Sequence, residues 1–217
     1  MNGNCFSQDS EKNIKNLNIK IGYASFNFSD PSIIGDNSFF NTGGTNTGSY
    51  NGYRGLNGIS LKLSYYLNNN LGLFADVTLT NKSVEHYVDP AVYKTNADMN
   101  IIKLGLTGRI IGKEYPVRLN LGTGLGLSIF SLDYSVTNGG TGTYLSGKNN
   151  FPGVFFNAEL VIPIYKSLHF FSQFEYIYVP ASELTLEHDG GSDYYSRYYD
   201  ANVGGIIIKL GLGIDLF

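Results

Sequence analysis

The polar side chains best suited to chemistry are grouped near the C-terminus of the 217-residue chain. Glu187, His188, Asp189, Ser192 and Asp193 lie within one short stretch that also contains glycine. A serine near a histidine and an acid could form a nucleophile with its activating base. The same residue types are ordinary in a polar loop. The stretch alone therefore predicts no catalytic residue.

The other histidines do not form a metal motif. His86 lies beside Glu85 and near Asp89, so these residues could contribute to a metal or acid–base site, but nothing in the sequence fixes their geometry. His169 alternates with aromatic residues and is expected to point into a polar interior. The three histidines lack the spacing of zinc ligands. We therefore predict no metal site and no cofactor.

Ten further charged residues lie in stretches where polar and apolar residues alternate. They are Lys20, Lys62, Asp76, Lys103, Arg109, Arg118, Glu159, Glu175, Lys209 and Asp215. Isolated buried charges are costly, so these residues should pair with one another. They predict an interior salt-bridge network. The alternative is that they line a narrow path for water or ions.

The stretch Gly204 to Phe217 shows most clearly what positions these charges. Every second residue from Ile206 to Leu216 is a large aliphatic, which gives a strand with one wholly apolar face. Seven earlier stretches follow the same pattern: Leu17 to Phe28, Leu56 to Leu67, Leu71 to Leu79, Ile101 to Ile111, Leu119 to Ile129, Val154 to Ile162, and Leu168 to Tyr178.

The connections between these eight stretches alternate in length. Short turns are predicted at Asn68 to Asn70, Gly112 to Pro116 and Pro163 to Ser167. Long loops are predicted at Ser29 to Gly55, Asn81 to Asn96, Ser131 to Asn150 and Pro180 to Asn202. This rhythm predicts an all-β, eight-stranded, antiparallel up-and-down transmembrane barrel with both termini in the periplasm. The first turn would place Lys62 directly opposite Asp76.

Alternation alone does not say which face of the barrel is inside. A soluble lipid carrier would bury the aliphatic face, whereas a membrane barrel would turn it to lipid. The polar face is rich in small residues and poor in charge, which suits the narrow interior of eight strands. Charged residues make up only 15% of the chain, against roughly 25% in soluble domains. Tyr23, Tyr65, Tyr176 and Tyr178 lie toward strand ends, where interfacial aromatics belong. We therefore predict the membrane arrangement.

This pattern, with a terminal aromatic at Phe217, resembles the small outer-membrane barrels of the OmpA-barrel and OmpX type and the porin-like barrels of Bacteroidota. The resemblance covers about Leu17 to Phe217. It implies an outer-membrane location with extracellular loops, contact with outer-membrane lipid, and contact with the barrel-assembly machinery during insertion. One departure is that Leu216, not Phe217, shares the lipid-facing parity.

The first residues differ from the rest of the chain. Residues 1–16 are predicted to be a signal-peptide remnant and a periplasmic lead-in, and residues 17–217 a single barrel domain. The phrase CFSQ resembles the end of signal peptides in Bacteroidota. Lipidation of Cys5 is an alternative that the neighbouring Asn4 disfavours.

A contact surface is suggested by the stretch DYYSRYYD. It contains Tyr194, Tyr195, Arg197, Tyr198 and Tyr199. Tyrosine and arginine are enriched at binding hot spots, although such residues could equally stiffen the barrel mouth. The net charge of −3 gives no indication of nucleic acid. We predict a non-enzymatic barrel that binds a ligand or a protein partner, or is a subunit of an outer-membrane complex. The alternatives are a narrow porin-like channel and a lipid-modifying enzyme.

Overall fold

The computed structural model describes residues 16–28, 55–88, 90–111, 116–138, 141–180, 182–189, 196–201 and 203–216. The strands are β1 (Asn16–Phe28), β2 (Leu56–Tyr66), β3 (Leu71–Val88), β4 (Ala91–Ile111), β5 (Arg118–Asn138), β6 (Thr141–Tyr165), β7 (Leu168–Tyr178), β8 (Ser182–Asp189), β9 (Ser196–Ala201) and β10 (Gly205–Asp215). Among the described residues, no helix is long and apolar enough to cross a membrane.

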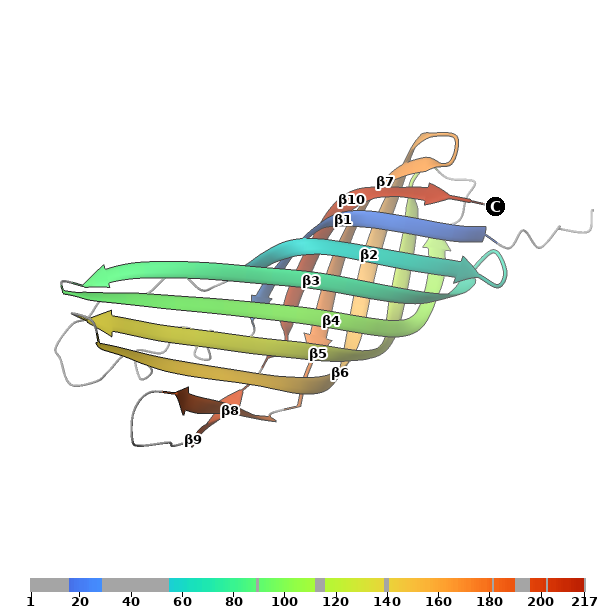
Figure 1. Cartoon of the computed structure of the whole chain (residues 1–217). Helices are drawn as coiled ribbons and strands as arrows, with labels where there is room; N and C mark the ends of the chain where they lie inside the picture. Colours follow the sequence, from blue (N-terminus) through green and yellow to red (C-terminus); the bar gives the residue numbers. More distant parts are fainter. Residues whose placement is uncertain are drawn as a thin grey trace, which may run out of the picture.

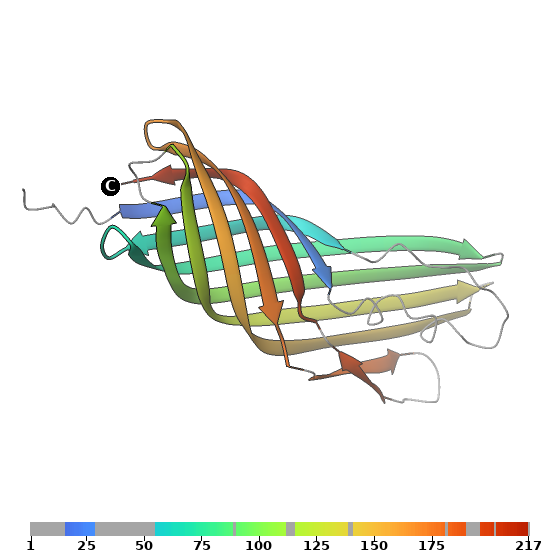
Figure 2. The same cartoon turned by 180° about the vertical axis from the view of Figure 1, so that it is seen from behind.

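Eight of these strands close into a ring. The order is β5-β4-β3-β2-β1-β10-β7-β6, and β5 also pairs with β6, so the sheet returns to its start. All the pairings are antiparallel. The predicted eight-stranded antiparallel barrel is confirmed. Figures 1 and 2 show that the start of β1, the end of β10 and the β2–β3 turn lie at one end of the barrel, which we call the turn end.

The β2–β3 turn forms as the sequence predicts. The amide of Leu67 donates to the carbonyl of Leu71 at 2.9 Å. The side-chain oxygen of Asn68 accepts the amides of Asn70 and Leu71 at 2.9 and 2.7 Å, as short polar side chains do in tight turns. This closure fixes the register that places Lys62 opposite Asp76.

Two of the predicted long loops are wrong. Strands β3 and β4 continue through Asn81 to Asn96 with an unbroken register to the last pair, Val88 with Ala91. Strands β5 and β6 continue through Ser131 to Asn150 in the same way. We call residues 81–88, 91–100, 131–138 and 141–150 the strand extension. In Figure 1 it projects beyond the barrel, away from the turn end.

The extension was missed because the polar and apolar faces exchange sides where it begins. On β4, Ile102 is 47% exposed and Lys103 is buried, so the apolar residue faces outward. Toward the start of β4 the faces are reversed. Ile101 and Met99 are fully buried, and Asn100 between them faces outward. A strand with one apolar face must turn that face toward whatever excludes water. Within the extension the apolar face therefore lies inward, and a search for outward aliphatics stops at the exchange.

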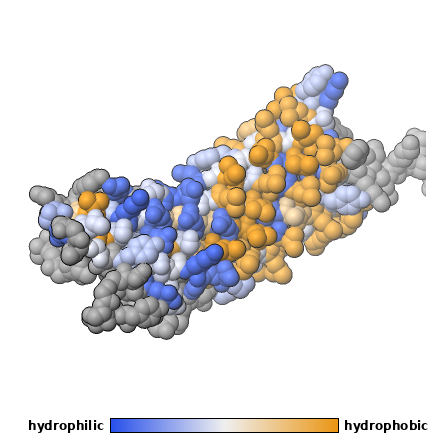
Figure 3. Space-filling view, in the orientation of Figure 1, coloured by the Kyte–Doolittle hydropathy of each residue, from blue (hydrophilic) through white to orange (hydrophobic). Residues whose placement is uncertain are grey.

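The exchange marks one edge of an apolar belt around the barrel. On β2, β3 and β4 the outward aliphatic run ends directly at an asparagine: Asn57, Asn81 and Asn100. Figure 3 shows the hydrophobic surface gathered on the barrel and hydrophilic surface on the strand extension. An apolar belt that is exposed around a barrel is typical of contact with lipid rather than water.

Two further connections differ from their predictions. The predicted fourth loop, Pro180 to Asn202, contains the hairpin β8–β9, and β8 pairs with β6 over Tyr144–Ser146. The predicted turn Pro163 to Ser167 is shorter, because β6 runs to Tyr165 with an irregular register after Pro163. Only Lys166 and Ser167 turn the chain, and Lys166 has a positive φ of 45°.

Some predictions fall outside the described residues. The predicted lead-in and signal remnant with Cys5 lie there up to residue 15, and β1 begins at Asn16 rather than Leu17. The first long loop, apart from Gly55, and the terminal Phe217 also lie outside. The outward parity expected of Leu216 agrees with its exposed side chain.

Candidate functional site

One group of interior charges is centred on Glu159 of β6. Lys20 donates to one carboxylate oxygen of Glu159, and Lys62 donates to the other at 2.9 Å. Asn120 on β5 donates to the first oxygen at 2.8 Å. All four side chains are buried. Residues from four strands therefore meet at one carboxylate inside the barrel.

A second group lies next to the first. Lys209 donates to both carboxylate oxygens of Asp76 at 2.8 and 2.7 Å. Lys103 lies 2.6 Å from Glu175 and 3.2 Å from Asp76. These four charges balance, and each is buried. Buried charges are tolerated only when they are paired in this way.

Gln173 on β7 joins the two groups. Its side-chain oxygen accepts Lys62 at 3.0 Å, and its amide nitrogen donates to Glu175 at 2.8 Å. The charges form one connected network across the barrel interior. The prediction that Lys62 lies opposite Asp76 is confirmed, but its ion partner is Glu159.

The charges at the turn end have different partners. Arg118 pairs with Asp215 at 3.1 Å, and Asn18 donates to Asp215 at 2.7 Å. The ring of His169 lies 3.3 Å from Asn18. Arg109 has no carboxylate partner among the described residues. It donates to the carbonyl of Asn69 at 2.9 Å, and its guanidinium lies 4.3 Å from the centre of the Tyr66 ring.

An apolar layer that the sequence analysis missed lies between the network and the strand extension. Its fully buried members include Phe26, Ile101, Phe130, Phe151 and Ile207. The ring of Phe28 packs edge-on against those of Phe26 and Phe130, with ring centres 4.7 and 5.8 Å apart. Adjacent apolar pairs such as Ile101–Ile102 and Ile129–Phe130 are the signal that could have found the layer, because one member of each pair must point inward. The layer fills the interior with side chains.

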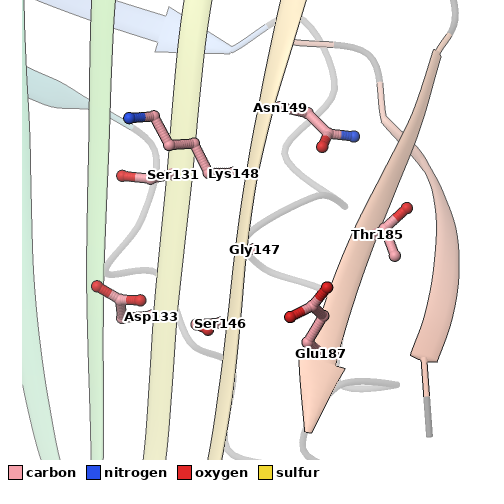
Figure 4. A pocket seen from close by; sticks show the side chains of 8 residues that line it. All are labelled: Ser131, Asp133, Ser146, Gly147, Lys148, Asn149, Thr185 and Glu187. Carbon is pink, nitrogen blue, oxygen red and sulfur yellow. The ribbon is translucent and has the colours of Figure 1, made fainter.

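A pocket of about 490 Å³ lies on the strand extension. It lies where β8 separates from β6, because β6 pairs with β8 only over Tyr144–Ser146 and with β7 only from Val154. Strand β5 contributes Ser131 and Asp133, β6 contributes residues 146–149, and β8 contributes Thr185 and Glu187 (Figure 4).

The arrangement can be compared with known proteins. No family model matches the chain, and no curated protein matches its sequence. Solved structures do match. The outer membrane protein OprG from Pseudomonas aeruginosa superposes with a TM-score of 0.62 at 12% identity, over 93% of this chain and 96% of OprG. The fold is that of a small outer-membrane β-barrel.

Two other barrels lead to the same conclusion. A major outer membrane protein from Thermus thermophilus matches with a TM-score of 0.60 at 11% identity, over 92% of this chain and 99% of the other. The structure of Ail, the attachment invasion locus protein of Yersinia pestis, in complex with the heparin analogue sucrose octasulfate also matches. Its TM-score is 0.55 at 18% identity, over 93% of this chain and 99% of Ail. At these identities the likeness concerns the fold.

The chemical candidates from the sequence do not assemble into one site on the described part of the outer-membrane barrel. Glu187, His188 and Asp189 belong to β8, while Ser192 and Asp193 lie outside the described residues. Glu85 and His86 belong to β3, and Asp89 lies outside. No group of three or more His, Cys, Asp or Glu that could hold a metal ion occurs among the residues the structure describes.

The predicted tyrosine-rich contact surface is only partly described. Arg197, Tyr198 and Tyr199 belong to β9, which pairs with β8. Tyr194 and Tyr195 lie outside the described residues. The stretch therefore belongs in part to the hairpin that borders the pocket.

Proposed function

We propose that this chain is a non-enzymatic outer-membrane protein that binds a ligand or partner outside the cell through its strand extension. The observation that carries the proposal is the exchange of faces at the belt edge. Beyond that edge, four strands continue as a sheet with a polar outer face and a pocket. Long strands whose extra length lies outside the lipid have no role in crossing it. The turn end, where β1 begins and β10 ends, then lies in the periplasm.

The filled interior favours binding over conduction. Lys62, Lys103 and Lys209 are each engaged by carboxylates. An eight-stranded barrel leaves room for little more than its own side chains. The apolar layer adds a barrier of buried apolar side chains between the network and the extension. We therefore expect no ion conductance.

Binding is also supported over catalysis. His169, whose side chain is described, is buried in the interior beside Asn18 and faces Asp215 at 4.0 Å. It has no access to a lipid substrate at the outer surface. Among the structural neighbours, Ail is named for attachment and invasion and was crystallised with a heparin analogue. These names add weight to an extracellular binding role for the shared fold.

The register allows a matched truncation that tests the proposal. Lys82, Ala97, Leu132 and Gly147 lie in one row across β3, β4, β5 and β6. Deleting residues 83–96 and 133–146, and joining each cut with an Asn-Gly turn, removes the outer part of the extension and the segment that pairs with β8, without shifting the remaining register of β3 to β6. Full-length and shortened chains would be displayed on the same cells and exposed to immobilised glycans and extracellular-matrix proteins.

We expect the full-length chain to bind and the shortened chain not to bind. Heat-dependent mobility on gels would first show that both chains are folded. Equal binding by the two chains would contradict the proposal. Conductance in planar bilayers that disappears in Lys62→Ala or Asp76→Ala would instead favour the channel. Sizing the protein after mild extraction from native membrane distinguishes a lone barrel from a complex subunit.

A further inference from the structure

We propose that the pocket between β5, β6 and β8 binds an oligosaccharide that carries a protonated amine. The inference rests on the proposed extracellular binding function and names the ligand class of one site in it. Two carboxylates lie on either side of one serine of β6. Ser146 on β6 is paired with Asp133 on β5 and with Glu187 on β8. Directly paired residues of antiparallel strands point to the same face, so both carboxylates flank the Ser146 hydroxyl.

Within the described part of the chain, neither Asp133 nor Glu187 takes part in an ion pair, and Asp133 accepts one hydrogen bond, from the hydroxyl of Tyr144. Glu187 is exposed, and Figure 4 shows it on β8 beside the gap that separates β8 from β6. Two strand spacings separate Asp133 from Glu187, which places their backbones roughly 10 Å apart. That span suits an extended ligand better than a single ion.

The rest of the lining selects for hydroxyl groups. Apart from Gly147, the other described lining residues carry hydroxyls, an amide and one ammonium, and none of these described side chains is apolar. Hydroxyls and amides both donate and accept hydrogen bonds, as sugar hydroxyls do. A purely apolar ligand would gain nothing here. Among the described lining residues, a polyanionic sugar would meet two carboxylates and one cation, Lys148.

An aromatic ring stands beside the pocket. Tyr144 is two residues from Ser146 on the same face of β6, and it is 40% exposed. Its hydroxyl donates to Asp133 at 3.0 Å, which holds the ring at the pocket edge. Tyrosine offers a flat apolar face together with a polar tip. A sugar ring could lie against that face while its amine reaches Asp133 or Glu187 through a charge-assisted hydrogen bond.

Calorimetric titration of the refolded full-length chain tests the inference. The probes are a chitosan trisaccharide with free amines, the corresponding N-acetylated chitin trisaccharide, and sucrose octasulfate, in a mildly acidic buffer that protonates the amines. We expect the chitosan trisaccharide to bind most tightly. The double variant Asp133→Asn/Glu187→Gln should weaken it about tenfold or more, because two charge-assisted contacts are lost. Glu85→Gln, which removes one carboxylate elsewhere on the extension, should leave binding unchanged.

The inference would be overturned by no binding of the chitosan trisaccharide, by equal binding to the double variant, or by tighter binding of sucrose octasulfate. A basic peptide that binds in place of the sugar and depends on the same two carboxylates would also overturn it. The shortened chain separates this failure from failure of the proposed function. If the sugar does not bind but truncation still abolishes binding to another immobilised ligand, the extension remains the binding part and only the ligand class is wrong.

Discussion

Lys62 and Asp76 face each other across the β2–β3 pair, yet the ion partner of each is a residue on a strand elsewhere in the barrel. Lys62 donates to Glu159 of β6, 97 residues away in sequence. Asp76 accepts Lys209 of β10, 133 residues away. The ion pairs therefore cross the interior rather than follow the hairpin. They link strands that share no backbone hydrogen bonds, so they should stabilise the closed ring as a whole.

Glu159→Gln should lower the free energy of unfolding by about 3–5 kcal/mol, the usual cost of removing one partner of a buried pair. Glu159 is the one carboxylate that both Lys20 and Lys62 contact. The change keeps the shape of the side chain but leaves two buried ammonium groups without an anion. Urea unfolding in lipid vesicles, followed by circular dichroism, measures the effect.

Two variants serve as controls for that experiment. Glu187→Gln makes the same substitution at an exposed position and should change stability by no more than about 0.5 kcal/mol. Adding Lys20→Met to Glu159→Gln removes one of the unpaired cations and should recover part of the loss. A Glu159→Gln protein that unfolds at the wild-type urea concentration would mean that the network contributes little.

Gly211→Ala should destabilise the barrel by about 1–3 kcal/mol, as overpacking of a filled interior does. A methyl group at Gly211 would collide with the carbonyl oxygen of Ile21 and lie 2.8 Å from the ring of Phe171. Gly108→Ala is the matched control, because its nearest neighbours would be 3.9 Å away. If the two variants have equal refolding yields and equal urea midpoints, the interior can accommodate a methyl group at Gly211.

Much of the barrel follows from the sequence because its governing signal is local. Outward aliphatics at every second residue are required wherever a strand crosses lipid, so each crossing carries its own pattern. The turn at Asn68 is likewise set by neighbouring residues, and its register places Lys62 against Asp76 without information from elsewhere. Strand number, strand direction and the inward parity of the charges are determined in this way.

The partners of the charges and the strand extension could not be predicted on the same basis. Which carboxylate lies near Lys62 depends on how the barrel closes, since Glu159 reaches it from the far side of the ring. The extension has a polar composition and a reversed alternation, so its sequence indicates loops. The pocket depends on where β8 leaves β6, and that arises from the pairing of β8 with Tyr144–Ser146 rather than from a motif.

Leu125→Arg should destabilise the inserted protein by about 2–4 kcal/mol, the cost of a cation at the bilayer midplane of such a barrel. Leu125 lies midway along the outward run of β5 and is 71% exposed. Ser135→Arg makes a comparable change on the same face of the same strand, beyond the belt, and should have little effect. Reversible unfolding in vesicles gives both values. If the two substitutions cost the same, the aliphatic surface does not face lipid.

Lys94→Cys and Asn69→Cys, each made in a Cys5→Ser background, should react with a bulky maleimide from opposite sides of the outer membrane. Lys94 is exposed on the strand extension, and Asn69 is exposed in the β2–β3 turn at the other end. Because the belt separates these ends, we expect Lys94→Cys to be labelled on intact cells and Asn69→Cys only after the membrane is opened. Labelling is read as a mass shift on gels, with the Cys5→Ser chain as the blank. The reverse pattern would place the extension and its pocket in the periplasm, and an extracellular ligand could not reach them.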